Sequence, residues 1–395
     1  MTIKQNTSKS ALLIVFAIPL IMILVSASRM LSLPVDPVHD QKYFITAGIF
    51  YPPYLEYNLS CVYVLKIYNF LAPHNLLAYN AGVMIIAMTL YLTAGALLLW
   101  SMTGRAHTAL YALFMMLLYT SRFIFLWSSK ELIAGAFLML ALWSIAKRMS
   151  FPVVAIFIVL FSFAKPDLIF SGAIVGIFLA FAQGNSWRGR IINLCVLVGL
   201  VILVLVPAYL QSGLQAMLPQ GYALYCLGQH YAALIASHQV TPVRLEPWLE
   251  YKKFFNPVWG EHKSVWEAIR SHPGLYRDFI FLSLGRTTQN LCKSFLIFLL
   301  LPAAYGLVTA GKSQLKTVAA LFLTGLIPML LLSWMHVRYA ARFYPVFLVL
   351  VLLWLQILEK KGGLYRGIII YLCCIVTLQI YFIIPVFQSA YWFPD

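Results

Sequence analysis

The sequence predicts an all-α protein, a polytopic bundle of transmembrane helices with about eleven spans. Of the 395 residues, 62% are hydrophobic and only 10% are charged, whereas a soluble domain is typically about a quarter charged. The mean hydropathy of +0.85 agrees. Because so few polar side chains cannot coat a folded chain of 44.7 kDa, most of its surface must face lipid. The net charge of +16 is scattered over loop ends rather than gathered in a basic arm, which argues against a nucleic-acid partner.

Eleven stretches are long and apolar enough, or nearly so, to cross a bilayer, which takes about 20 apolar residues. They are 11–33, 77–100, 106–127, 132–146, 151–164, 168–183, 191–210, 288–310, 317–335, 343–358 and 367–386. Lys4 and Lys9 precede the first stretch, and no small-residue cleavage site follows it. We therefore expect an anchored helix there rather than a removed signal peptide.

The distribution of charge predicts the orientation. With the N-terminus inside, the cytoplasmic ends hold 12 of the 28 basic residues and one of the 12 acids, Glu359. An excess of Lys and Arg marks the cytoplasmic side, so we expect a multi-pass plasma (inner) membrane protein with a cytoplasmic N-terminus. The other 11 acids then lie on the periplasmic or extracellular side.

Two outer segments are too long to be simple turns. We expect one membrane-embedded domain over 1–395, with a first outer loop at 34–76 and a large outer loop at 211–286. The stretch 55–71 has apolar residues at Leu55, Leu59, Val62 and Leu65 or Ile67, with Glu56, Ser60 and Lys66 between them, and this pattern predicts a helix lying along the interface. Loops of this length are usually functional. The six cysteines show no CxxC or Cys/His ligand spacing, so neither a metal site nor a disulfide scaffold is predicted.

Four charged loop tips gather on the predicted outer side, while the spans hold almost no ionisable residues. The absence of acids near the bilayer midplane argues against an ion-coupled transporter. The tips are 34–54 with Asp36, His39, Asp40 and Lys42; 128–131 with Lys130 and Glu131; 165–167 with Lys165 and Asp167; and 336–342 with His336, Arg338, Tyr339 and Arg342. A structural alternative exists for most of these residues: cations near helix ends snorkel to lipid phosphate, Lys130 and Glu131 form a simple ion pair, and Asp36 shapes a Pro-rich turn.

The tips resemble those of the GT-C class of integral membrane glycosyltransferases, which use polyprenyl-phosphate-linked sugars. The similar segments are Asp40-Gln41-Lys42-Tyr43 followed by Thr46-Ala47-Gly48 and Tyr51-Pro52-Pro53-Tyr54, then Glu131-Leu132 leading to Lys147-Arg148, Lys165-Pro166-Asp167, Arg338-Tyr339, and Arg342-Phe343-Tyr344-Pro345. The chain lacks the paired Asp-Glu of many members and has no Asp-x-Asp. No particular cofactor is predicted, and a divalent cation stays open.

The resemblance implies transfer of a single sugar, with inversion, from a polyprenyl-phosphate donor to a lipid-linked glycan, lipid or cell-envelope acceptor. Asp40 is the expected general base, with Asp36 as its substitute and Glu131 as a second acid that orients the acceptor. Cations stabilise the charge that develops on the leaving phosphate. The expected donor and acceptor contacts come from Lys42, Tyr43, Lys165, Asp167, His336, Arg338, Tyr339 and Arg342, with Lys165, Arg338 and Arg342 as the phosphate clamp.

Other functions remain open. A polysaccharide polymerase or ligase would use a pyrophosphate-linked oligosaccharide, a lipid-linked saccharide flippase would catalyse no transfer, and a structural subunit would need no charged tips. The aromatic residues of the large outer loop have two readings as well: they stack on sugar rings, or they lie in the headgroup layer. They are Trp248, Trp259, Trp266, His262 and His272.

Overall fold

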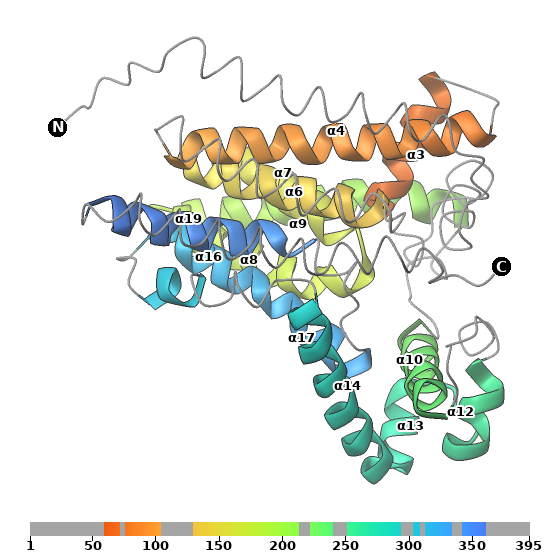
Figure 1. Ribbon diagram of the computed structural model, residues 1–395. Helices are drawn as coiled ribbons and strands as arrows, with labels where there is room; N and C mark the ends of the chain where they lie inside the picture. Colours follow the sequence, from red (N-terminus) through yellow and green to blue (C-terminus); the bar gives the residue numbers. More distant parts are fainter. Residues whose placement is uncertain are drawn as a thin grey trace. The chain divides into compact units, whose positions relative to one another are not determined.

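The computed structural model describes residues 59–71, 76–103, 129–212, 222–239, 251–293, 303–308, 313–333 and 342–360. Within these ranges every regular element is a helix and none is a strand (Figure 1). The all-α prediction is therefore confirmed for the described residues. The predicted spans at 11–33, 106–127 and 367–386 lie outside them, and the total of about eleven spans stays a prediction.

Several helices are long and apolar enough to cross a membrane. In the described part of the chain four meet this criterion: Ile85–Met102, Pro166–Gln183, Trp187–Leu210 and Gln314–Leu332. Phe151–Ser162 and Tyr344–Trp354 are shorter apolar helices. These lengths and compositions indicate a membrane protein, as the composition predicted.

The chain divides into two compact units, and each is described by itself. Unit 1 comprises residues 1–220, 312–328 and 338–349, and unit 2 comprises 221–311, 329–337 and 350–395. The main elements of unit 1 are α3 (Leu59–Leu71), α4 (Leu76–Thr103), α6 (Ser129–Ala146), α7 (Phe151–Ser162), η2 (Pro166–Leu168), α8 (Ile169–Gln183), α9 (Trp187–Ser212), α16 (Gln314–Phe322), η4 (Leu323–Gly325) and the first turns of α19 (Tyr344–Lys360). Those of unit 2 are α10 (Tyr222–Gln239), α12 (Tyr251–Trp259), α13 (Val265–Ser271) and α14 (Pro273–Lys293).

The helices α6, α7, α8 and α9 follow one another through short turns. Helix α6 packs against α4 and α7, and α7 packs against α8 and α9 (Figure 1). Successive helices run in opposite directions, so the start of α6, the end of α7 and the start of α8 share one end of unit 1. The end of α6 and the starts of α7 and α9 share the opposite end.

Small residues allow these helices to approach closely. A Cβ atom added to Gly172 of α8 would lie 1.7 Å from Ser162 Oγ of α7, and one added to Gly176 would lie 2.9 Å from Leu197 Cδ2 of α9. A Cβ at Gly325 would lie 2.9 Å from Ser171 Oγ and 3.1 Å from Phe343 Cζ. Such contacts are typical of helices packed in membranes, where small residues allow backbones to meet.

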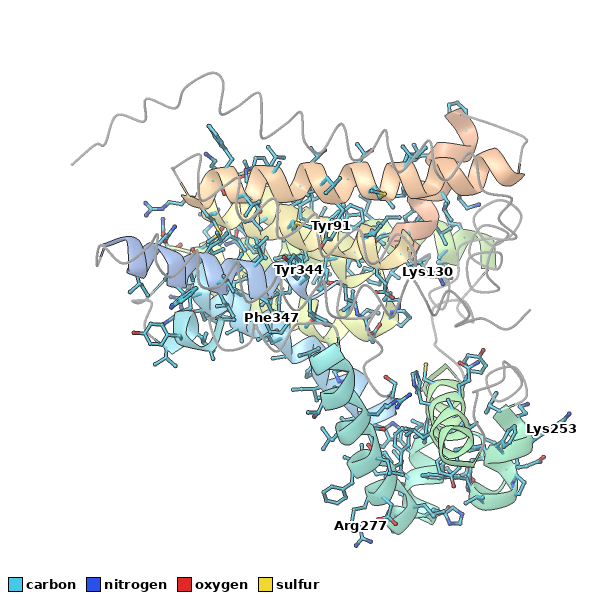
Figure 2. The ribbon with its side chains drawn as sticks, viewed as in Figure 1. Tyr91, Lys130, Lys253, Arg277, Tyr344 and Phe347 are labelled. Carbon is cyan, nitrogen blue, oxygen red and sulfur yellow. The ribbon has the colours of Figure 1, made fainter. Side chains whose placement is uncertain are left out.

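Unit 2 has an aromatic core. Trp259 is fully buried, its ring stacked on Phe255 at 5.2 Å and edge-on to Tyr231 at 5.5 Å between centroids. Helix α13 starts at a capping arrangement in which Ser264 Oγ accepts from the Glu267 backbone N–H at 3.2 Å. The exposed side chains of Lys253 and Arg277 point away from this core (Figure 2).

Candidate functional site

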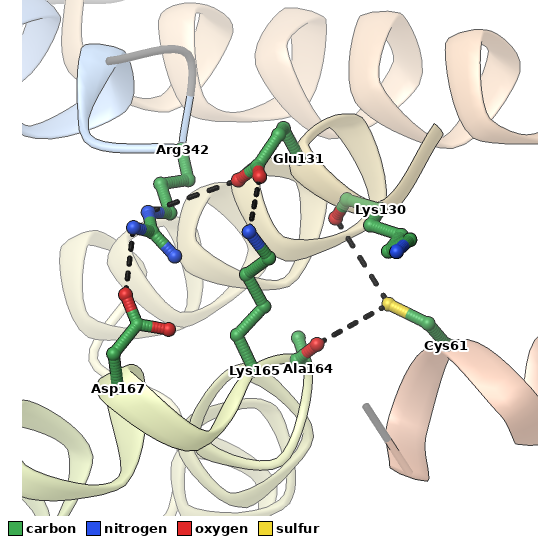
Figure 3. A network of polar contacts seen from close by, with 7 residues as sticks. All are labelled: Cys61, Lys130, Glu131, Ala164, Lys165, Asp167 and Arg342. Carbon is green, nitrogen blue, oxygen red and sulfur yellow. Dashed lines mark hydrogen bonds and ion pairs between the residues drawn. The ribbon is translucent and has the colours of Figure 1, made fainter. Parts of the chain in front are cut away.

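Four of the predicted site residues come together in unit 1. They are Glu131, Lys165, Asp167 and Arg342, and they form one continuous set of ion pairs (Figure 3). Three separate parts of the chain supply them, namely the start of α6, the turn between α7 and α8, and the residue two before α19. We call this set the charged network.

Local sequence explains why the turn presents its charges here. Pro166 has no backbone N–H and a fixed φ, so it favours the first position of a helical turn. It opens η2, and Lys165 before it is extended, with φ −153° and ψ 146°, as the residue before proline usually is. Asp167 therefore lies in the first turn of η2, one residue after the bend. Glu131 lies in the first turn of α6, where the helix dipole favours a negative charge.

The four charges alternate in sign. Lys165 Nζ donates to Glu131 Oε1. Arg342 Nε lies 3.7 Å from Glu131 Oε2, and Arg342 Nη2 lies 2.6 Å from Asp167 Oδ2. Glu131 thus sits between two cations, and Arg342 sits between two carboxylates.

The network is largely removed from solvent. Glu131 is 2% exposed and Arg342 is 1% exposed, while the side chains of Lys165 and Asp167 are 13% and 21% exposed. Charges buried to this extent must be paired, because an isolated buried ion loses its hydration without compensation. The guanidinium of Arg342 also lies 5.5 Å from the centroid of the Phe343 ring, which adds a cation–π contact.

Helix α3 docks against the same turn through backbone contacts. The Ser60 N–H donates to the Phe163 carbonyl at 3.0 Å, and Cys61 Sγ lies 3.6 Å from the Ala164 carbonyl oxygen and 3.9 Å from that of Lys130 (Figure 3). Burial raises the pKa of the Cys61 thiol to about 12, so it stays a neutral packing group at pH 7. These contacts could not be predicted from the sequence, because their acceptors are main-chain carbonyls.

The remaining predicted site residues lie outside the described residues: Asp36, Asp40, Lys42, Tyr43, His336, Arg338 and Tyr339. Their roles stay predictions. The simple pair of Lys130 with Glu131 is not the arrangement found, since Glu131 pairs with Lys165 and Arg342.

The aromatic residues of the large outer loop differ in accessibility. Trp259 is 0% exposed and packed among Phe255 and Tyr231, so it fits neither of the two expectations, stacking on a sugar ring or lying in the headgroup layer. Trp266 is 69% exposed. The rings of His262 and His272 lie 5.9 Å apart. Trp248 lies outside the described residues.

Neither metal ligation nor similarity to other proteins adds to this site. In the ranges that the structure describes, no group of three or more His, Cys, Asp or Glu side chains could hold a metal ion. No protein-family model matches the chain, and no similar curated protein or solved structure was found. A functional interpretation therefore rests on the chemistry of the charged network and on the sequence around it.

Proposed function

We propose that the protein is a membrane glycosyltransferase of the GT-C type, with its active site on the periplasmic or extracellular face. It moves one sugar, with inversion, from a polyprenyl-phosphate donor to a lipid-linked glycan, lipid or cell-envelope acceptor. The observation that carries the proposal is the charged network: the buried Arg342 and the partly buried Lys165, held in place by carboxylates at one end of an apolar helical unit.

The location of such cations suits a lipid phosphate. The reactive head of a polyprenyl phosphate lies where the hydrocarbon core meets water, and Lys165 and Arg342 precede apolar helices that start at one end of unit 1. A guanidinium fork matches the geometry of phosphate oxygens. In a buried setting of low dielectric constant, fixed cations stabilise the negative charge of a leaving phosphate more than they would in water.

The carboxylates of the network have a supporting role in this proposal. Glu131 is 2% exposed and engaged by both cations, so we assign it to positioning Lys165 and Arg342 rather than to contacting the acceptor. Asp167 fixes the other edge of the guanidinium through the 2.6 Å pair. The cations are thereby oriented before the donor binds, and preorganised groups need little rearrangement during the reaction.

The chemical step uses the first outer loop. Asp40, with Asp36 as its substitute, removes the proton of the acceptor hydroxyl. The acceptor oxygen bonds to the anomeric carbon as the bond from that carbon to the phosphate oxygen breaks. The electron pair leaves with the polyprenyl phosphate, whose charge Lys165, Arg338 and Arg342 stabilise. Lys42, Tyr43, His336 and Tyr339 complete the substrate contacts.

A stabilising role alone gives a weaker account of the network. Replacing buried ion pairs by apolar side chains of similar volume is often neutral or stabilising. A helical protein that needed only stability therefore has little reason to bury Glu131 and Arg342. A phosphate-binding role supplies that reason.

The test is transfer of radiolabelled sugar by the purified chain in nanodiscs, with a panel of polyprenyl-phosphate monosaccharides as donors. Asp40→Asn and Asp40→Ala should lower turnover about a hundredfold or more, the usual size of a general-base effect. Arg342→Lys keeps the charge but loses the fork, and should raise the donor KM. Arg277→Lys in unit 2, whose side chain is 71% exposed, is the matched control.

Two results would overturn the proposal. Full transfer activity in both Asp40 variants would show that Asp40 is not the general base. An unchanged donor KM in Arg342→Lys would show that Arg342 does not bind the donor phosphate. Activity with a pyrophosphate-linked oligosaccharide alone would identify a polymerase or ligase instead. Movement of the lipid-linked sugar across the bilayer without transfer would identify a flippase.

A further inference from the structure

The end of unit 1 opposite the charged network carries a cationic surface. It consists of Lys147, Arg148, Arg188 and Arg190, and we call it the basic end. Among the described residues of unit 1 the only acids are Glu131 and Asp167, and both belong to the network. No described carboxylate of this unit therefore lies near the four cations.

The topology brings these four residues to the same end. Helix α6 ends at Ala146 and α7 begins at Phe151, while α8 ends at Gln183 and α9 begins at Trp187. Because α6 to α9 alternate in direction and α7 packs against α9, the two connecting turns lie at the same end of the unit. Lys147, Arg148 and Arg188 are exposed, and Arg190 is half-buried with its Nε donating to the Gly184 carbonyl at 3.4 Å.

Arg148 occupies a backbone position that normally favours glycine. Its φ is +54°, and the bonds around it form a Schellman motif: Met149 N–H to Ser144 O at 2.9 Å and Arg148 N–H to Ile145 O at 3.0 Å. A left-handed conformation costs a residue other than glycine about 1–2 kcal/mol. The chain keeps a guanidinium at this position despite that cost.

The neighbouring helix α9 places the basic end at the level of lipid headgroups. Its window Trp187–Leu210 has a mean hydropathy of 2.9 and only 6% of it is buried, so the face of α9 that does not pack against α7 and α8 would contact lipid in a membrane. At about 1.5 Å per residue it is about 36 Å long, enough to cross the hydrocarbon core. Trp187 at its start is 67% exposed, and tryptophan prefers the membrane–water interface. Arg188 and Arg190 follow directly.

We propose that the basic end is a binding site for the headgroup of an anionic phospholipid. The guanidinium groups of Arg148 and Arg188 pair with its phosphate oxygens, Lys147 adds a third positive charge, and Trp187 lies against the glycerol region. The apolar side chains that follow on α9, such as Ile191 and Ile192, 44% and 53% exposed, contact the acyl chains. The proposal is independent of the reaction assigned to the charged network.

Binding can be measured on the full chain in detergent by thermal shift. The probes are phosphatidylglycerol, phosphatidylcholine of the same acyl chains, and inorganic phosphate. Phosphatidylglycerol should bind most tightly. Each basic residue near an anionic lipid surface contributes enough to change affinity about fivefold. Arg148→Gln and Arg188→Gln should each weaken phosphatidylglycerol binding by about that factor, and the double variant by about 25-fold.

Two further variants make the test specific. Lys252→Gln/Lys253→Gln removes two exposed charges from α12 of unit 2 and should leave the affinity unchanged. Arg148→Gly should weaken lipid binding like Arg148→Gln, yet raise the melting temperature without lipid, because glycine relieves the left-handed backbone.

Three results would overturn the proposal. Equal affinity for phosphatidylcholine would show that the charge of the lipid does not matter. An unaltered affinity for phosphatidylglycerol in the double variant would show that the lipid binds elsewhere. Inorganic phosphate binding as tightly as phosphatidylglycerol would make the basic end a site for free anions.

Discussion

Glu131 and Arg342 are the residues on which the charged network depends. Each is almost fully buried, and each has two partners of opposite charge. Removing one member of a buried ion pair leaves its partner charged, dehydrated and uncompensated, which costs far more than the pair itself contributes. The four side chains should therefore behave as one unit. The loss of stability on substituting one of them should depend on which buried charge is left without its partner.

Glu131→Gln should destabilise the protein by about 3 kcal/mol, because the amide keeps the shape but removes the carboxylate that Lys165 and Arg342 share, and only the pair of Arg342 with Asp167 is left. Asp167→Asn should cost less, about 1 kcal/mol, since its side chain is 21% exposed and water replaces part of the interaction. Denaturant unfolding of the purified chain in one detergent measures both.

The matched control for these variants is Asp278→Asn. Asp278 pairs with Arg277 at 3.1 Å, but the two side chains are 60% and 71% exposed, so the loss should be under about 0.5 kcal/mol. If Glu131→Gln were no more destabilising than this control, the network would not be the energetic unit described above. A Glu131→Gln/Lys165→Met double variant should cost less than the sum of its single changes.

The sequence singled out the four residues that form the network, but it did not predict how they pair. Glu131, Lys165, Asp167 and Arg342 stood out because each is a charge at the edge of an apolar stretch. The adjacent Lys130 was the obvious partner for Glu131, yet consecutive residues on a helix point in different directions. The actual partners come from distant turns, and single-sequence patterns carry no information about which turns meet.

At the scale of elements, the hairpin of α7 and α8 positions the network. Its turn carries Lys165 and Asp167, and its two helices meet where Gly172 faces Ser162. The Ser162 hydroxyl donates to the Ile158 carbonyl of its own helix at 2.7 Å, so it cannot swing aside without losing a bond. The absence of a side chain at residue 172 is therefore what lets the hairpin close.

Gly172→Ala should destabilise the protein by about 1–3 kcal/mol, the usual cost of overpacking, because the new methyl group would lie 1.7 Å from Ser162 Oγ. Ser162→Gly in the same chain should restore much of the loss, since the nearest remaining atom, the Ser162 Cα, would be 3.4 Å away. Thermal unfolding in detergent compares the variants. Gly199→Ala on α9, where a Cβ meets nothing within 4 Å, should cost nothing. Equal effects at Gly172 and Gly199 would show that the hairpin does not depend on this contact.

Helix positions in this part of the chain could be predicted closely. The stretches 151–164 and 168–183 correspond to α7 (Phe151–Ser162) and to η2 followed by α8, and 55–71 contains α3 (Leu59–Leu71). Long apolar runs and a Lys-Pro-Asp turn suffice for that. The docking of α3 on the Phe163 carbonyl and the left-handed Arg148 could not be predicted, because both depend on backbone geometry that many sequences share.

At the scale of the whole molecule, the two ends of unit 1 differ in kind. One end pairs two acids with two cations that are buried or partly buried, and the other exposes cations without a described acid of the unit. Positive residues are retained on the cytoplasmic side of membrane proteins, whereas acids have little influence on topology. The basic end should therefore face the cytoplasm and the charged network the opposite compartment, where a lipid-linked donor would be used.

Cysteine labelling tests this orientation directly. In a chain whose native cysteines are replaced, Phe70→Cys on α3 and Ser186→Cys in the turn before α9 place exposed thiols at the network end and the basic end, respectively. A membrane-impermeant maleimide added to intact spheroplasts should label residue 70 at once and residue 186 only after permeabilisation, because a span of about 30 Å of hydrocarbon separates the two ends. Detergent-solubilised protein, in which both sites should react, is the control for accessibility. The reverse labelling pattern would place the charged network on the cytoplasmic side and would contradict the proposed transfer on the outer face. It would not contradict the lipid site at the basic end, which would then face the outer leaflet.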